Sequence, residues 1–155
     1  MSTKTPRRTA MRDMTDRVRR LNSAVNAHDL NPIGDMYAND AELKWPGLPA
    51  MKGRQAVVEF YAQMFGAFPD LHVTLERIAE QDGVVAAEYE AGATNSGPLP
   101  MPGGQFLPPT QRRIAVHATS VGTVDHEGRI KVQHEYFDQL DVLTQLGILA
   151  VPTAR

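Results

Sequence analysis

The stretch RRIAVHATSVGTVDHEGRIKVQHEYF, residues 112–137, decides the fold class. It contains two runs rich in alternating and β-branched residues, 112–124 and 129–137, separated by the polar turn DHEG at 125–128. Two such runs around a short turn with glycine are typical of a β-hairpin. We therefore expect two long antiparallel strands here, followed by a short helix through 138–146.

A second hairpin is predicted upstream of this one. Leu71, Val73 and Leu75 alternate with other residues, and a Gln-Asp-Gly turn at 81–83 leads into a returning strand at 84–94. The segment 95–109 between the two hairpins is rich in proline and glycine, so we expect it to be a loop.

The first half of the chain has helical periodicity. Met14, Val18, Leu21 and Val25 recur at intervals of three and four, which predicts an amphipathic helix over 9–28. Further elements are expected as helices at 32–37 and 57–68 and a short strand at 41–45. Helices first and strands afterwards indicate one α+β domain over 9–150, behind a disordered tail at 1–8.

Composition excludes several classes of function. The chain has 155 residues, a net charge of -2 and no cysteine. Thiol nucleophiles and zinc-thiolate sites are therefore excluded, and the charge gives no sign of nucleic-acid or membrane partners. Neither a signal-peptide core nor an apolar membrane span is present, so we expect a cytoplasmic protein. A curved sheet covered by helices should instead hold a small hydrophobic molecule in a cavity at its open end.

Asp138 is the first candidate for catalysis. Even-numbered side chains of the last strand share one face, which places Ile130, His134 and Tyr136 in a row that ends at Asp138. The apolar start of this row indicates the inward face. Burial would disfavour the charged form of Asp138 and raise its pKa toward the range useful for an acid/base. The alternative is that Asp138 is the N-cap of the last helix.

His117 is the candidate partner on the preceding strand. Alternation there does not decide which face is inward, and we expect the face with His117 and Thr119. Its imidazole would then lie beside His134 and Tyr136, a group suited to abstracting a proton and polarising a carbonyl. The alternative is an ordinary strand histidine without a role in catalysis.

Neither a metal nor a cofactor is expected. The histidines, at positions 28, 72, 117, 126 and 134, have none of the spacings typical of metal sites. The chain also lacks the glycine patterns of nucleotide-binding loops.

Aromatic side chains are the candidate walls of the cavity. The expected substrate-binding residues are Trp45, Phe60, Tyr89 and Tyr136, together with Thr119 on the preceding strand and Met101, which closes the cavity from the loop. Most of these side chains would also suit an ordinary core. Tyr89 alternates with Glu88 and Glu90, so the tyrosine should face the cavity while the glutamates face solvent or a subunit partner.

Four short motifs suggest a family: TNSGP at 94–98, GRI at 128–130, YFD at 136–138 and LTQLG at 143–147. With the order of elements, they resemble the SnoaL-like polyketide cyclases of the nuclear transport factor two-like superfamily. The resemblance covers residues 11–147. It implies a cone-shaped α+β barrel, in which N-terminal helices pack into a curved antiparallel sheet, and a homodimer.

The resemblance also implies a reaction. In these cyclases the aspartate matching Asp138 is the acid/base of a cofactor-free aldol closure, with the aromatic matching Tyr136 beside it. Thr119 and Val121 stand where the cyclases carry glutamine and histidine, so His117 would replace the imidazole. We expect cyclisation or isomerisation of a hydrophobic, carbonyl-bearing, polyketide-like substrate. The alternatives are a dehydratase, a ketosteroid-isomerase-like enzyme or a non-catalytic binding protein of the same fold.

Overall fold

A six-stranded sheet in the order β2-β1-β8-β7-β4-β3 forms the framework of the protein. The computed structural model describes the backbone of residues 6–150 and the side chains of residues 14–150. The helices are α1 (Pro6–Asn26), α2 (Leu30–Asp35), α3 (Arg54–Ala67) and α4 (Gln139–Gln145). The sheet strands are β1 (Tyr37–Lys44), β2 (Met51–Lys52), β3 (His72–Gln81), β4 (Val84–Thr94), β7 (Arg113–Val124) and β8 (Ile130–Phe137).

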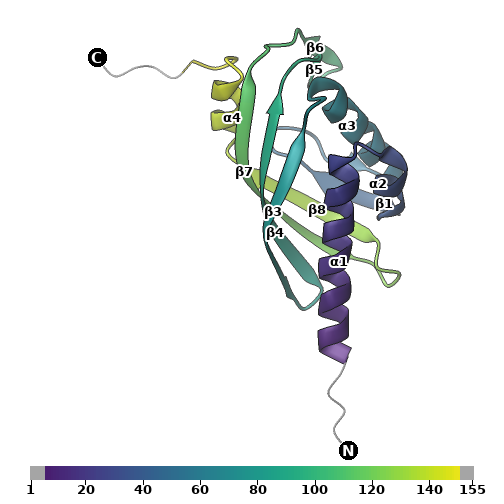
Figure 1. The fold of residues 1–155 in the computed structure, drawn as a ribbon. Helices are drawn as coiled ribbons and strands as arrows, with labels where there is room; N and C mark the ends of the chain where they lie inside the picture. The colour runs from purple at the N-terminus through teal and green to yellow at the C-terminus, as the bar shows by residue number, and fades with distance from the viewer. Residues whose placement is uncertain (1–5, 151–155) are drawn as a thin grey trace, which may run out of the picture.

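The curved sheet is covered by helices on one face. Figure 1 shows α1, α2 and α3 on the same side of the sheet, with α1 running alongside β3. The core between these layers includes the fully buried side chains of Ile33, Tyr37, Leu43 and Val57. The expected α+β class, with N-terminal helices packed into a curved sheet, is confirmed. Within the described residues, no helix is long and apolar enough to cross a membrane.

Strand pairing departs from a purely antiparallel meander at one point. β1 runs parallel to β8, with Leu43 opposite Gln133 and Lys44 opposite His134. A parallel pair needs a long crossover connection, which the chain between β1 and β8 supplies. This pairing brings the first strand beside the last one and places Tyr37 behind the inner face of β8.

A β-bulge decides which face of β8 points inward. Val124 pairs with Ile130, whereas the preceding Thr123 pairs with Val132, so Lys131 is an extra residue in β8. An extra residue inverts the alternation of side chains beyond it. Gln133 and Glu135 are therefore only 7% and 3% exposed, while Tyr136 is 50% exposed. The prediction that the even-numbered face of β8 points inward is wrong for this reason.

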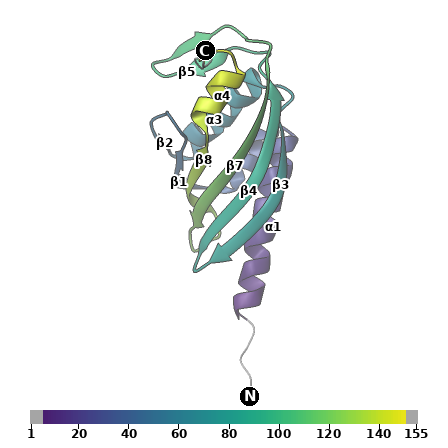
Figure 2. The same ribbon diagram turned by 90° about the vertical axis from the view of Figure 1, so that its left-hand side faces the viewer.

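The segment 95–109 forms a second, two-stranded sheet instead of a plain loop. This hairpin consists of β5 (Leu99–Met101) and β6 (Gln105–Leu107), and Figure 2 shows it beyond the ends of α3 and α4. Gly97 and Asn95 attach it to the end of α3: the Gly97 amide donates to Ala67 O, and Asn95 Nδ2 donates to the same carbonyl. The segment that leads into the hairpin is therefore held against the C-terminal end of α3.

The N-terminal end of the domain begins earlier than expected. Helix α1 starts at Pro6, three residues before the predicted start at Thr9. Residues 1–5 of the expected disordered tail lie outside the described residues.

Candidate functional site

A large cavity lies between α1, α2 and the inner face of the sheet. Its volume is about 790 Å³, within the size range of small-molecule sites. Much of its lining is aliphatic, and it includes Val18, Leu21, Val25, Val73, Leu75, Val85 and Ala87. Polar side chains enter this wall from β4, β7 and β8, so they are the candidates for chemistry.

Glu135 on β8 is the central polar group of the cavity. Tyr89 Oη donates a hydrogen bond to Glu135 Oε2 over 2.5 Å, and Gln133 Nε2 donates to Glu135 Oε1 over 2.6 Å. The Ser120 hydroxyl is also hydrogen-bonded to the carboxylate. All four residues line the cavity. The register explains the arrangement, because Ser120 lies directly opposite Glu135 and Ala87 directly opposite Ser120 on adjacent strands.

Burial sets the protonation of this group. Desolvation raises the pKa of Glu135 above its ordinary value of 4.5, and the hydrogen bonds from Tyr89, Gln133 and Ser120 oppose that rise. Desolvation also raises the pKa of Tyr89, with a further contribution from the charge of Glu135. A carboxyl group with a raised pKa beside a protonated tyrosine can accept a proton and support a nearby oxyanion.

Two further tyrosines extend the network behind Glu135. Tyr37 Oη donates to Gln133 Oε1 over 2.6 Å and lies 2.9 Å from Tyr61 Oη. Because the single proton of Tyr37 is used on Gln133, Tyr61 must donate to Tyr37. Burial raises the pKa of Tyr61 to about 12 and that of Tyr37 well above its ordinary value. Both tyrosines therefore act as donors, and Tyr61 also lines the cavity.

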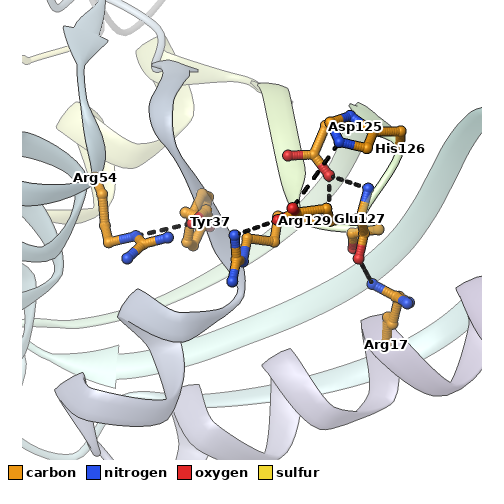
Figure 3. A network of polar contacts seen from close by, with 8 residues as sticks. Arg17, Tyr37, Arg54, Asp125, His126, Glu127 and Arg129 are labelled. Carbon is orange, nitrogen blue, oxygen red and sulfur yellow. Dashed lines mark hydrogen bonds and ion pairs between the residues drawn. The ribbon is translucent and has the colours of Figure 1, made fainter.

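The β7–β8 turn is fastened to α1 at one end of the cavity. Figure 3 shows the Asp125 carboxylate within the turn, where it accepts the amides of Glu127 and Arg129, both at 2.9 Å. These backbone hydrogen bonds lower the pKa of Asp125. Arg17 of α1 donates to the carbonyl oxygens of Gly128 and Glu127. This end of the cavity, lined by Arg17, Gly128 and Arg129, is thus held in place.

A second cavity of about 570 Å³ lies under the β5–β6 hairpin, next to α3 and α4. It shares five lining residues with the main cavity: Trp45, Met64, Leu71, Tyr89 and Ala91. These five side chains therefore form a wall that the two cavities share.

Asp138 lies outside both cavities. It is the N-cap of α4, where its Oδ1 accepts the amide of Asp141 over 3.1 Å, and its side chain is exposed. The prediction that Asp138 is buried at the end of an inward-facing row is therefore wrong. The capping role that the sequence left open is the one that the structure shows.

The two histidines expected beside Asp138 also face away from the cavity. His134 stacks on Tyr136 with ring centroids 4.1 Å apart, on the outer face of β8. His117 has a side chain that is 76% exposed and lies 3.9 Å from Glu76. With Glu90, these two residues place three potential metal-ligand atoms within 4.8 Å of one another, all on exposed side chains. The prediction that the His117 face of β7 points inward is wrong.

The predicted substrate-binding residues divide into two groups. Trp45 and Tyr89 line the main cavity, and with Phe60 and Met101 they also line the second. Thr119 and Tyr136 pair with each other on the outer face, away from either cavity. The expectation that Tyr89 faces inward while Glu88 and Glu90 face outward is confirmed.

Glu135, Gln133, Ser120 and Tyr37 were missed as site residues. The signal for the first two was present as a Gln-x-Glu pair on one face of a strand. Two polar residues at alternate positions of a strand predict a face that points to solvent. Only the bulge at Lys131 reverses that prediction for Gln133 and Glu135. Tyr37 and Tyr61 are distant in sequence, and only the fold brings their hydroxyl groups together.

Comparison with known proteins agrees with this architecture. The family model described as a SnoaL-like domain matches residues 18–133. The chain belongs to the SnoaL-like domain family. The matched range includes Gln133 and ends two residues before Glu135, so the match itself assigns no role to Glu135 or Asp138.

Solved structures with this fold include candidate polyketide cyclases. A candidate SnoaL-like polyketide cyclase from Jannaschia sp. CCS1 has 19% sequence identity and a TM-score of 0.76, covering 88% of this chain and 93% of its own. IdmH, a candidate polyketide cyclase from Streptomyces antibioticus, has 26% identity and a TM-score of 0.69, covering 86% and 98%. SalBIII, an epoxide hydrolase/cyclase-like enzyme of pyran ring formation in salinomycin, has 22% identity and a TM-score of 0.70, covering 84% and 95%. No curated protein matches the chain by sequence.

Proposed function

We propose that this SnoaL-like protein is an enzyme that moves a proton on a hydrophobic, carbonyl-bearing substrate, with Glu135 as the acid/base. One observation carries the proposal. Glu135 is 3% exposed, lines a cavity with a largely aliphatic wall, and has a pKa raised by desolvation. A buried carboxyl group with a raised pKa in the wall of a cavity is a typical proton carrier.

The proposed step is enolisation. Ionised Glu135 takes a proton from the carbon next to the substrate carbonyl, and the electron pair of that C–H bond moves into the carbonyl, which becomes an enolate. Tyr89, whose raised pKa keeps it protonated, donates its single proton to Glu135 while that carboxylate is ionised; once Glu135 has taken the substrate proton, the hydroxyl turns to donate to the enolate oxygen. The proton on Glu135 then returns to carbon or oxygen, so the step needs neither a metal nor a cofactor.

The same enolate serves two reactions of the expected class. From a β,γ-unsaturated ketone, return of the proton to the γ-carbon of the conjugated enolate is an isomerisation. Attack of the enolate carbon on a second carbonyl of the same molecule, whose oxygen then takes the proton from Glu135, is an aldol cyclisation. Family membership and the likeness to candidate polyketide cyclases support the cyclisation. The substrate is then a polyketide-like compound with at least two carbonyl groups.

The test is exchange of the α-protons of methyl nonyl ketone in deuterated buffer, followed by proton NMR. The wild type should accelerate exchange, and Glu135→Gln should slow it by at least about a hundredfold, since acid/base groups contribute that much or more. Glu88→Gln, on the exposed outer face of β4, is the matched control. Exchange that survives in Glu135→Gln would contradict the proposal.

Asp138→Asn distinguishes the role implied by the family resemblance from the role proposed for Glu135. We expect exchange close to that of the wild type, because Asp138 caps a helix outside the cavities. Loss of exchange in Asp138→Asn, with Glu135→Gln active, would return the acid/base role to Asp138.

A second candidate function is ligand binding without catalysis. It is favoured by the hydrogen bonds that both oxygens of Glu135 already accept. Binding of the ketone by a wild type that gives no exchange above the buffer rate would establish this second function.

A further inference from the structure

The second cavity differs in chemistry from the main one. Of the described residues that line it, Glu59 alone carries a formal charge, whereas the main cavity has the Glu135 network and charged residues such as Arg17 and Arg129 in its wall. Apart from Glu59, Gln63 and Gln139, its walls from α3, α4, the β5–β6 hairpin and the inner face of β7 are apolar. A cavity of this composition favours a hydrocarbon occupant, since burying apolar surface is its main source of binding free energy.

The wall between the cavities is aromatic and is part of the proposed active site. Tyr89 directs its hydroxyl to Glu135 and lines both cavities. Trp45 lines both cavities as well, with its ring 4.9 Å from that of Phe60 and 5.2 Å from that of Phe137. A molecule whose carbonyl group lies beside Tyr89 therefore has the second cavity directly next to it.

We propose that the second cavity binds the apolar tail of the substrate, so the substrate is an elongated molecule. Its carbonyl-bearing end lies against Glu135 and Tyr89, and its alkyl chain or fused-ring tail passes Trp45 and lies under the β5–β6 hairpin. The position of the carbonyl end rests on the proposed function. The tail site itself rests on the wall that the two cavities share and on the composition of the second.

The test is a series of methyl ketones with alkyl chains from pentyl to tridecyl, with the Kd measured by calorimetry. Trp45 is the only tryptophan of the chain, so its fluorescence reports on the wall between the cavities. The Kd should fall by about fourfold for each methylene that enters the tail site, from about 0.8 kcal/mol per buried methylene. An affinity that does not change with chain length would overturn the proposal.

Ala56→Phe is designed to fill the tail site from α3. Ala56 is partly buried and lines the second cavity but not the main one. Tridecyl methyl ketone should bind at least tenfold more weakly, with the Kd of the pentyl ketone unchanged. Ala62→Phe is the matched control, because Ala62 lies on the same helix, is exposed and lines neither cavity. Equal losses for short and long ketones would contradict the tail site.

Val142→Phe fills the same cavity from α4 and serves if Ala56→Phe does not fold. Failure of the tail site can be distinguished from failure of the proposed enzymatic function. Glu135→Gln should keep the dependence of Kd on chain length although it loses proton exchange. If the wild type binds long ketones more tightly but gives no proton exchange, the tail site is supported and the proposed enzymatic function is refuted. If it gives exchange but its affinity does not depend on chain length, the proposed function is supported and the tail site is refuted.

Discussion

Glu135 makes the stability of the protein depend on pH. Its pKa is raised by burial above the ordinary 4.5, so the folded state holds the proton more tightly than the unfolded state. As the pH rises above 4.5, the unfolded state ionises first and is favoured by doing so. The free energy of unfolding of the wild type should therefore decrease between the unfolded and folded pKa values and level off above the folded one.

Glu135→Gln removes this dependence, since glutamine does not titrate in this range. Urea unfolding at a series of pH values should show the difference in unfolding free energy between wild type and variant moving in favour of the variant as the pH rises. A difference that moves in favour of the wild type would mean that the pKa of Glu135 is lowered, not raised.

Asn95 stabilises the fold through the hydrogen bonds of its buried side chain. It is fully buried, and its amide nitrogen donates to the carbonyls of Ala67 and Gly97 while its oxygen accepts from Thr110. Asn95→Leu leaves these partners unpaired at about 1–3 kcal/mol each, so we expect a loss of at least about 3 kcal/mol in unfolding free energy. The measurement is urea unfolding, with the exposed neighbour changed in Ser96→Ala as a control.

Residue-level prediction succeeded where the strand was regular and failed where it was not. Tyr89 lies on β4, whose alternation pairs without a break along β7, and its inward direction was predicted correctly. Glu135 lies beyond the bulge at Lys131 in β8. A bulge depends on the partner strand, so no pattern within the strand itself could reveal the inverted face.

At the level of elements, the β7–β8 turn needs glycine for two reasons. Gly128 has a φ of +77°, and a Cβ atom there would meet the guanidinium of Arg17. Gly83, in the β3–β4 turn, has a φ of +80° with open space around it. Both glycines thus have a left-handed backbone conformation, but only at Gly128 would an added Cβ atom also meet a neighbouring side chain, that of Arg17.

The pair Gly83→Ala and Gly128→Ala separates these reasons. Gly83→Ala should cost about 1 kcal/mol from the left-handed backbone alone. Gly128→Ala should cost about 1 kcal/mol more, because it displaces a hydrogen bond from Arg17 to the turn. Thermal unfolding gives both values, and equal losses would show that the contact with Arg17 contributes nothing to stability.

The long elements were predictable because their periodicity is local. Helix α1, the β3–β4 hairpin and the β7–β8 hairpin all lie within a few residues of their predicted positions. The β5–β6 hairpin was not predicted, since prolines such as Pro100 argue against a strand, yet edge strands tolerate them. The parallel pairing of β1 with β8 joins distant segments, so nothing in either strand indicates its partner.

At the level of the whole molecule, the shared fold limits the function without choosing it. The same architecture serves candidate cyclases and an epoxide hydrolase/cyclase-like enzyme, so the reaction depends on the side chains of the cavity. The family and the α+β class could be predicted from short motifs and the order of elements. The site could not, because its residues meet only through the assembled sheet.

A ligand that occupies both cavities should stabilise the whole domain. Binding to the folded state alone contributes about 3 kcal/mol at a ligand concentration of about a hundred times Kd. Tridecyl methyl ketone should therefore raise the melting temperature of the wild type by several degrees and that of Ala56→Phe by much less, as measured by calorimetry. An equal rise in the two proteins would place the alkyl chain outside the second cavity.

The amide of Gln133 insulates Glu135 from the rest of the interior. It accepts from Tyr37 on one side and donates to Glu135 on the other, so it passes on polarisation but, unlike a hydroxyl group, does not readily hand over a proton. A proton taken up by Glu135 therefore has no exit through the tyrosine pair and must leave by way of the cavity. Deuterium abstracted from a bound ketone should accordingly pass to solvent through the cavity, and mass spectrometry after a single turnover in ordinary water should detect its loss from the ketone.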